Sequence, residues 1–190
     1  MYEIVLARKT QANIGNDLVR YNLRNSENTL FEVSMNEQIQ RAYESLSQKI
    51  GESESPSDWF EITQERINDF ADATLDDQWI HVNPERAKAS PFGGTIAHGD
   101  LTLSIMNQLP REQPLSIYRV EGMKHMLNYG FDRVRFPAPV LVGSRIRAHS
   151  TLKRVEFKKG MIEIMVEVSV EAEGMPKPCC VAENLFLLVF

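Results

Sequence analysis

The sequence predicts an α+β domain in which a curved antiparallel sheet wraps around one buried helix. Helical patterns fill the first half of the chain, strand patterns fill the second half, and a nearly uninterrupted apolar run lies between them at Leu101–Leu109. A helix that is apolar on almost all sides is expected to be buried. A sheet is the element that can cover it. This arrangement is the hot-dog fold.

The first 57 residues are predicted to form an N-terminal extension. Apolar residues recur at helical spacing over 38–50, which predicts an amphipathic helix: Ile39, Tyr43, Leu46 and Ile50. The stretch "GESESPSDW" that follows is rich in Gly, Ser, Glu and Pro, a composition typical of linkers. The main domain is therefore expected at 58–190.

Two short helices are predicted ahead of the apolar run, each from its capping residue. Thr63 is a suitable N-cap for "QERINDFADA", and Asn83 is one for "NPERAKA", which has proline at its first position, where proline fits. The stretch between them, "TLDDQWIH" (74–81), has no helical pattern. The apolar helix is expected to end at Pro110.

The second half of the chain has the period-two pattern of strands. Over 162–173, aliphatic residues alternate strictly with a row of mostly Glu, so one face is expected to be buried and the other solvated. A similar segment at 144–157 precedes it, and "KKG" (158–160) is expected to join the two as a hairpin. A last strand is predicted over 178–190, with one or two more between 116 and 140.

Composition excludes several classes of function. The net charge of −5 argues against a broad basic surface for nucleic acid. No apolar run approaches the roughly 20 residues that a membrane helix needs, and the start "MYEIVLARKT" lacks the pattern of a signal peptide. A cytoplasmic location is therefore expected. Cys179 and Cys180 are adjacent, so they cannot build a disulfide framework and are expected to be reduced.

The stretch 74–81 concentrates groups that can do acid–base chemistry. Asp76 and His81 are five residues apart, and a loop that folds back would bring carboxylate and imidazole to one water molecule. Imidazole titrates near neutral pH and therefore suits proton transfer in either direction. The simpler interpretation is that Asp72, Asp76 and Asp77 are helix-end and turn residues, and that His81 is a loop histidine.

Gly99 is the second candidate, because it opens the predicted apolar helix directly after His98. A helix N-terminus presents free N–H groups and the positive end of the helix dipole. Glycine lets a ligand approach that backbone closely. Such N–H groups can hold a carbonyl oxygen as negative charge develops on it.

These segments resemble a known family. The stretch from "FEITQERINDF" through "TLDDQWIH" to "AHGDLTLSIM" is similar to the MaoC-like dehydratases, also called the (R)-specific enoyl-CoA hydratases, and to their nodulation protein N-like branch. The family signature is roughly T-G-D-x-N-P-I-H, followed by A-H-G. The resemblance covers about residues 58–190 and implies a hot-dog fold. It implies that Asp76 and His81 hold the attacking water, that the Gly99 N–H forms the oxyanion site, and that His98 is structural.

Two departures from the signature concern the substrate. Leu75 stands where the family has glycine, and Gln78-Trp79 stands where it has Asn-Pro. We expect Leu75, Gln78, Trp79 and His98 to lie at the substrate site, where Leu75 or Trp79 would narrow the acyl pocket.

The resemblance implies reversible hydration of trans-2-enoyl thioesters to (R)-3-hydroxyacyl thioesters, carried by coenzyme A or an acyl carrier, with no metal and no cofactor. It also implies a homodimer or higher homo-oligomer joined through sheet edges. The alternative is a hot-dog thioesterase or a non-catalytic acyl-thioester binder, since one fold hosts several activities. A metal-dependent hydrolase using Asp76, His81 and His98 is disfavoured, because no third strong ligand stands at local motif spacing.

Overall fold

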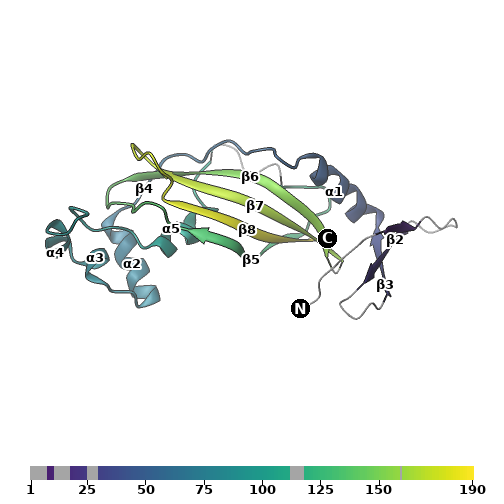
Figure 1. Ribbon diagram of the computed structural model, residues 1–190, viewed down its shortest axis with the longest axis horizontal. Helices are drawn as coiled ribbons and strands as arrows, with labels where there is room; N and C mark the ends of the chain where they lie inside the picture. Colours follow the sequence, from purple (N-terminus) through teal and green to yellow (C-terminus); the bar gives the residue numbers. More distant parts are fainter. Residues whose placement is uncertain (1–7, 11–17, 25–29, 112–117, 159) are drawn as a thin grey trace.

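A computed structural model describes residues 8–10, 18–24, 30–111, 118–158 and 160–190, with side chains from residue 37 onward. Its centre is a curved, five-stranded antiparallel sheet (Figure 1). In spatial order the strands are β4 (Phe60–Glu61), β6 (Arg145–Lys158), β7 (Met161–Ala172), β8 (Cys180–Val189) and β5 (His125–Arg135). A separate three-stranded antiparallel sheet contains β1 (Arg8–Thr10), β2 (Leu18–Arg24) and β3 (Leu30–Asn36).

The helices are arranged around the two ends of the large sheet (Figure 1). Helices α2 (Gln64–Thr74), α3 (Trp79–Val82), α4 (Pro84–Lys88) and α5 (Gly99–Ile105) gather at one end, and α1 (Glu37–Gln48) lies near the other. The two predicted caps are confirmed: Thr63 Oγ1 accepts the Arg66 N–H at 3.3 Å, and Asn83 Oδ1 accepts the Arg86 N–H at 3.0 Å. None of the helices in the described ranges is long and apolar enough to cross a membrane.

The alternation predicted for strand β7 is confirmed. Its inward residues, from Ile162 to Ala172 at every second position, are all buried in the main core. One outward residue departs from the expected solvated face. Glu163 is only 2% exposed, because Lys158 Nζ donates to its carboxylate at 2.6 Å and Arg154 contacts it at 3.4 Å. The hairpin turn predicted at 158–160 includes residue 159, which lies outside the described residues.

The central helix is shorter than predicted. Helix α5 ends at Ile105 and a turn follows, in which the Gln108 N–H donates to the Ile105 carbonyl at 2.8 Å. The expectation of burial on almost all sides was wrong, because Asp100 and Ser104 face solvent. The predicted α+β architecture with a curved sheet stands, with α5 lying against β8.

The segment expected to be a linker is attached to the sheet edge. The N–H groups of Gly51, Glu54 and Ser57 donate to carbonyls of β6 at 2.7, 2.9 and 2.9 Å. Helix α1 packs on β6 and β7, and its Leu46 is fully buried in the main core. The boundary at residue 57 stays a prediction, but residues 37–57 share the core of the domain that follows.

Candidate active site

Asp76 is placed by the way helix α2 ends. Leu75 takes the left-handed conformation, with φ 63° and ψ 19°, and its N–H donates to the Ala71 carbonyl at 2.7 Å. This ending reverses the chain direction, as a glycine usually does at such a position. It explains why the family signature has glycine there. Asp76 then leads toward α3, so the 74–81 stretch is not wholly non-helical as predicted: His81 lies in a one-turn helix.

His81 is held in a single tautomer. Its side chain is 7% exposed, and Nδ1 lies 2.7 Å from the Ile96 carbonyl oxygen. A carbonyl oxygen can only accept, so Nδ1 carries the proton and Nε2 of the neutral ring has a free lone pair. Burial lowers the pKa of His81, and nearby His98 lowers it further, whereas the Ile96 bond and the Asp76 charge oppose the shift. The ring is therefore a neutral base at pH 7.

His98 contacts both His81 and the backbone of Asp76. Its ring stacks on that of His81 with centroids 3.8 Å apart, and its Nε2 donates to the Asp76 backbone carbonyl at 2.9 Å. The side chain is 3% exposed. These contacts fix both the ring of His81 and the loop that carries Asp76. They favour the structural role that the family resemblance implied for His98.

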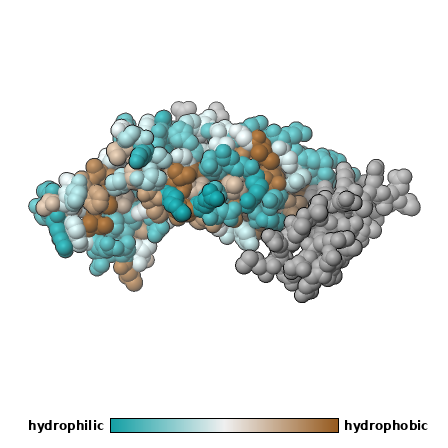
Figure 2. All heavy atoms as spheres, in the orientation of Figure 1, coloured by the Kyte–Doolittle hydropathy of each residue, from teal (hydrophilic) through white to brown (hydrophobic). Residues whose placement is uncertain are grey.

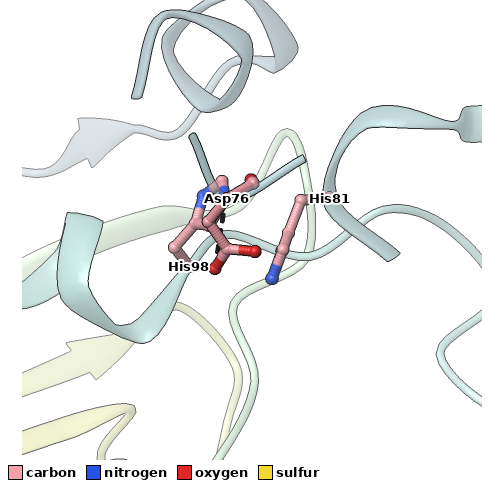
Figure 3. Close-up of side chains that lie close together, drawn as sticks. All are labelled: Asp76, His81 and His98. Carbon is pink, nitrogen blue, oxygen red and sulfur yellow. Dashed lines mark hydrogen bonds and ion pairs between the residues drawn. The ribbon is translucent and has the colours of Figure 1, made fainter. Parts of the chain in front are cut away.

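The three side chains converge on one spot (Figure 3). One polar atom from each of Asp76, His81 and His98 lies within 4.8 Å of the others, and Asp76 Oδ2 is 4.0 Å from His98 Nε2. Asp76 is partly exposed, so this end of the cluster is open to a ligand or to water. One nitrogen of each ring already donates to a carbonyl. His81 Nε2 and the Asp76 carboxylate remain for a water or ligand, and His98 Nδ1 is buried without a partner.

Gly99 begins helix α5 at the edge of this cluster. A Cβ atom on Gly99 would lie 2.9 Å from the ring of Phe136, too close for any other residue without a shift of that ring. Its N–H belongs to the first turn, whose N–H groups have no intrahelical acceptor. The position therefore combines a free N–H donor with a backbone that packs closely against the Phe136 ring.

Gln64 is a site residue that the sequence did not reveal. Its Nε2 donates to the His81 carbonyl at 2.8 Å, and its Oε1 accepts from the buried Thr95 hydroxyl at 2.5 Å. The side chain therefore ties α2 to α3 and to the strand-like segment before α5. A glutamine in the first turn of a helix is common, so no sequence signal distinguishes this one.

The four predicted substrate residues differ in their exposure. His98 is buried against His81, whereas Leu75 is 86% exposed and Gln78 is also exposed. The Trp79 ring packs under the Arg86 guanidinium at 4.2 Å. The role of these four residues in substrate binding stays a prediction.

Two buried histidines and a carboxylate thus lie beside a helix N-terminus at one end of the curved sheet of a hot-dog protein. The sequence profile of the family described as "MaoC like domain" matches residues 45–174. The chain belongs to this family, which confirms the resemblance seen in the sequence.

Individual relatives agree with the family. The chain is 52% identical over 149 residues to 3-hydroxyacyl-thioester dehydratase Z of Mycobacterium tuberculosis H37Rv, covering 76% of this chain and 96% of that protein. It is 42% identical over 144 residues to Nodulation protein N of Rhizobium leguminosarum bv. viciae, covering 75% and 88%. The X-ray structure of a monoamine oxidase regulatory protein from Archaeoglobus fulgidus superposes with a TM-score of 0.61 at 27% identity, covering 73% and 89%.

Proposed function

We propose that the protein catalyses the reversible addition of water to trans-2-enoyl thioesters, giving (R)-3-hydroxyacyl thioesters. The observation that carries the proposal is the fixed tautomer of His81. Its Nδ1 is committed to the Ile96 carbonyl, so Nε2 is a neutral base beside Asp76 and next to the start of helix α5. The name of the 52% identical relative, a 3-hydroxyacyl-thioester dehydratase, supports the same reaction.

The reaction needs a nucleophilic water, a stabilised oxyanion and a proton for the α-carbon. Asp76 and His81 Nε2 hold one water, and His81 takes its proton as the oxygen bonds to the β-carbon. The electron pair of the double bond moves toward the thioester carbonyl, whose oxygen accepts a hydrogen bond from the Gly99 N–H. The imidazolium then returns a proton to the α-carbon, so water is added overall and no group is oxidised. The dehydration direction runs the same steps backward.

The test is loss of the conjugated enoyl absorbance when crotonyl-CoA is mixed with the protein. Release of free thiol, measured in parallel, reports thioester hydrolysis. Hydration without thiol release supports the proposal. Thiol release without hydration would instead make the protein a thioesterase. Binding of the thioester with neither reaction would make it a binding protein.

We further propose that the working unit is a homodimer joined through strand β5. Within the described chain β5 pairs only with β8, so its other edge is open. That strand carries exposed apolar side chains at Met126, Leu127, Tyr129 and Phe131. An open apolar edge is usually covered by another strand. Light scattering at micromolar concentration should give twice the 21.7 kDa of one chain, and a clean monomer would contradict the dimer.

The two thiols support a cytoplasmic location for this enzyme. Cys179 and Cys180 are both free and buried, and burial raises the pKa of the Cys179 thiol to about 11. Unpaired thiols are typical of reducing compartments. Fractionation of the native host should recover the protein with cytoplasmic markers.

A further inference from the structure

A cavity lies beyond the C-terminal end of helix α5, away from the cluster of Asp76, His81 and His98. It has a volume of about 680 Å³ and is bounded by the end of α5 with the turn after it, by the segment 118–128, and by the inner face of β6, β7 and β8. Ser104 on its wall is five residues beyond Gly99. At 1.5 Å per helical residue the cavity therefore begins roughly 7.5 Å from the proposed oxyanion site. Neither Gly99 nor the Asp76, His81 and His98 cluster lines the cavity, so an acyl chain bound at the oxyanion site would have to run along α5 to enter it.

The wall of this cavity is unusually polar. Ligand pockets are mostly lined by apolar side chains, but more than half of the side chains here carry hydrogen-bonding groups. Amides are supplied by Asn107, Gln108 and Asn128, and the exposed cations Arg119 and Lys124 stand at the rim. Among the described residues no carboxylate lines the cavity.

The polar groups continue into its buried floor. Tyr118 and Ser150 line the cavity with 2% and 3% exposure, beside the apolar Val166 and Phe186. Arg111 Nη2 donates to the Ser150 hydroxyl at 3.4 Å, and the buried Tyr118 hydroxyl has no hydrogen-bond partner within the described chain. Burying hydrogen-bonding groups against a plain hydrocarbon leaves them unpaired and so disfavours binding of a plain alkyl chain.

Both polar side-chain atoms of Asn184, a neighbour of these groups, lack a hydrogen-bond partner within the described chain. It lies opposite Val166 in the β7–β8 register and two residues before Phe186, so its side chain shares the inner face with two residues of the cavity wall. Asn184 is also 0% exposed. A buried carboxamide without partners needs an explanation. Asn184 does not itself line the cavity, but a ligand oxygen that reached past Val166 and Phe186 would supply one.

We propose that this cavity receives the distal part of the acyl chain, and that the preferred substrates are enoyl thioesters whose chain carries an oxygen-containing group several carbons beyond the double bond. This rests on the hydratase function proposed above. The group is a hydroxyl, carbonyl or carboxylate, since donors from Asn184, Tyr118 and Ser150 and the cations at the rim all complement oxygen. A plain alkyl chain of the same length leaves those donors unpaired.

The test compares matched eight-carbon enoyl-CoA substrates, about 9 Å long by ordinary bond lengths, that end in methyl, hydroxyl or carboxylate. Crotonyl-CoA, too short to reach the cavity, is the reference. We expect kcat/KM at least about tenfold higher for one of the oxygenated chains than for the methyl chain. Asn184→Leu and Tyr118→Phe should each reduce that preference about tenfold and leave crotonyl-CoA hydration within about twofold of wild type. Thr151→Val, on the outer face of the same strand as Ser150, is the matched control and should change neither.

Calorimetry measures how tightly the wild type binds the saturated eight-carbon analogues. This measurement needs neither catalysis nor a variant that folds. Tighter binding of the oxygenated analogue supports the proposal. Equal or tighter binding of the methyl analogue overturns it, as does a preference that survives both variants. If the variants lower kcat/KM equally for every substrate, crotonyl-CoA included, the cavity binds the coenzyme A arm that all substrates share, and the proposal is overturned. If crotonyl-CoA is not hydrated at all, the proposed function fails, and the binding comparison still decides the role of the cavity.

Discussion

Replacing Leu75 with glycine should stabilise the protein. Leu75 is the only non-glycine residue in the described chain with positive φ, at 63°. The left-handed conformation costs an L-residue roughly 1–2 kcal/mol. Its side chain is 86% exposed, so removing it takes almost no packing from the fold. Glycine in turn costs about 0.4–1 kcal/mol through the entropy of the unfolded chain. The net gain is about 0–1.6 kcal/mol, or a rise of up to about 6 °C in Tm for a chain of this size.

Urea and thermal unfolding of the wild type and the Leu75→Gly variant measure this difference. Leu75→Asn should gain part of it, because asparagine tolerates the same conformation. Ile50→Gly is the matched control: Ile50 is 47% exposed but has an ordinary φ, so glycine there should destabilise the fold. A lower free energy of unfolding in Leu75→Gly would contradict the prediction that the left-handed conformation of Leu75 destabilises the fold. That result would mean that the leucine side chain packs against another molecule, such as the second chain of a dimer.

Three further predictions concern the site and the core. Gly99→Ala should lower kcat at least tenfold and the free energy of unfolding by about 1–3 kcal/mol, because its Cβ would lie 2.9 Å from the Phe136 ring and must displace it. Adding Phe136→Ala should restore part of both, and an unchanged kcat in the single variant would count against the oxyanion role. A chain beginning at Ser57 should lose cooperative unfolding because it lacks the fully buried Leu46, whereas one beginning at 37 should keep it; calorimetry of both chains tests this. The pKa of His81 is lowered in the folded protein, so the folded ring binds a proton less readily than the ring in the unfolded chain. Both the free energy of unfolding and kcat/KM should therefore fall as the pH drops below the ordinary value of 6.5. A pH profile that is flat in this range, or a His81→Gln variant with the same pH profile as the wild type, would contradict this prediction.

Elements fixed by local chemistry were predictable from the sequence. Thr63 and Asn83 cap their helices as expected, because capping depends on neighbours three residues away. The buried face of β7 follows directly from its alternation. Asp76 and His81 do lie together, because the chain between them is short enough to fold back on itself.

Elements decided by distant contacts were not predictable. The polar stretch before Ser57 looked like a linker, yet its backbone pairs with β6, about a hundred residues away in the chain. Backbone hydrogen bonds of this kind leave no trace in side-chain composition. Gln64 reaches His81 and Thr95 only because α2, α3 and the segment before α5 meet in space. The apolar run after Gly99 did not reveal that the helix stops at Ile105.

The described part of the surface in Figure 2 has no single large apolar patch that would by itself indicate a binding face. Figure 2 shows hydrophobic patches over the helical end and along the sheet, separated by hydrophilic residues. Scattered patches of this kind are ordinary for soluble proteins. The cluster of Asp76, His81 and His98, and not a single large apolar surface, is therefore the feature that indicates function.

The most direct test of the account is crotonyl-CoA hydration by four variants: Asp76→Asn, His81→Gln, the double variant, and Asp77→Asn. If Asp76 and His81 hold one water in one step, each single change should lower kcat by about 10²–10⁴, the usual range for acid–base groups. The double change should cost little more than the worse single, since groups that act as a unit are not additive. Asp77 is exposed and lies outside the cluster, so Asp77→Asn should keep the wild-type rate. Full activity in Asp76→Asn, or additive losses in the double variant, would contradict the shared-water mechanism.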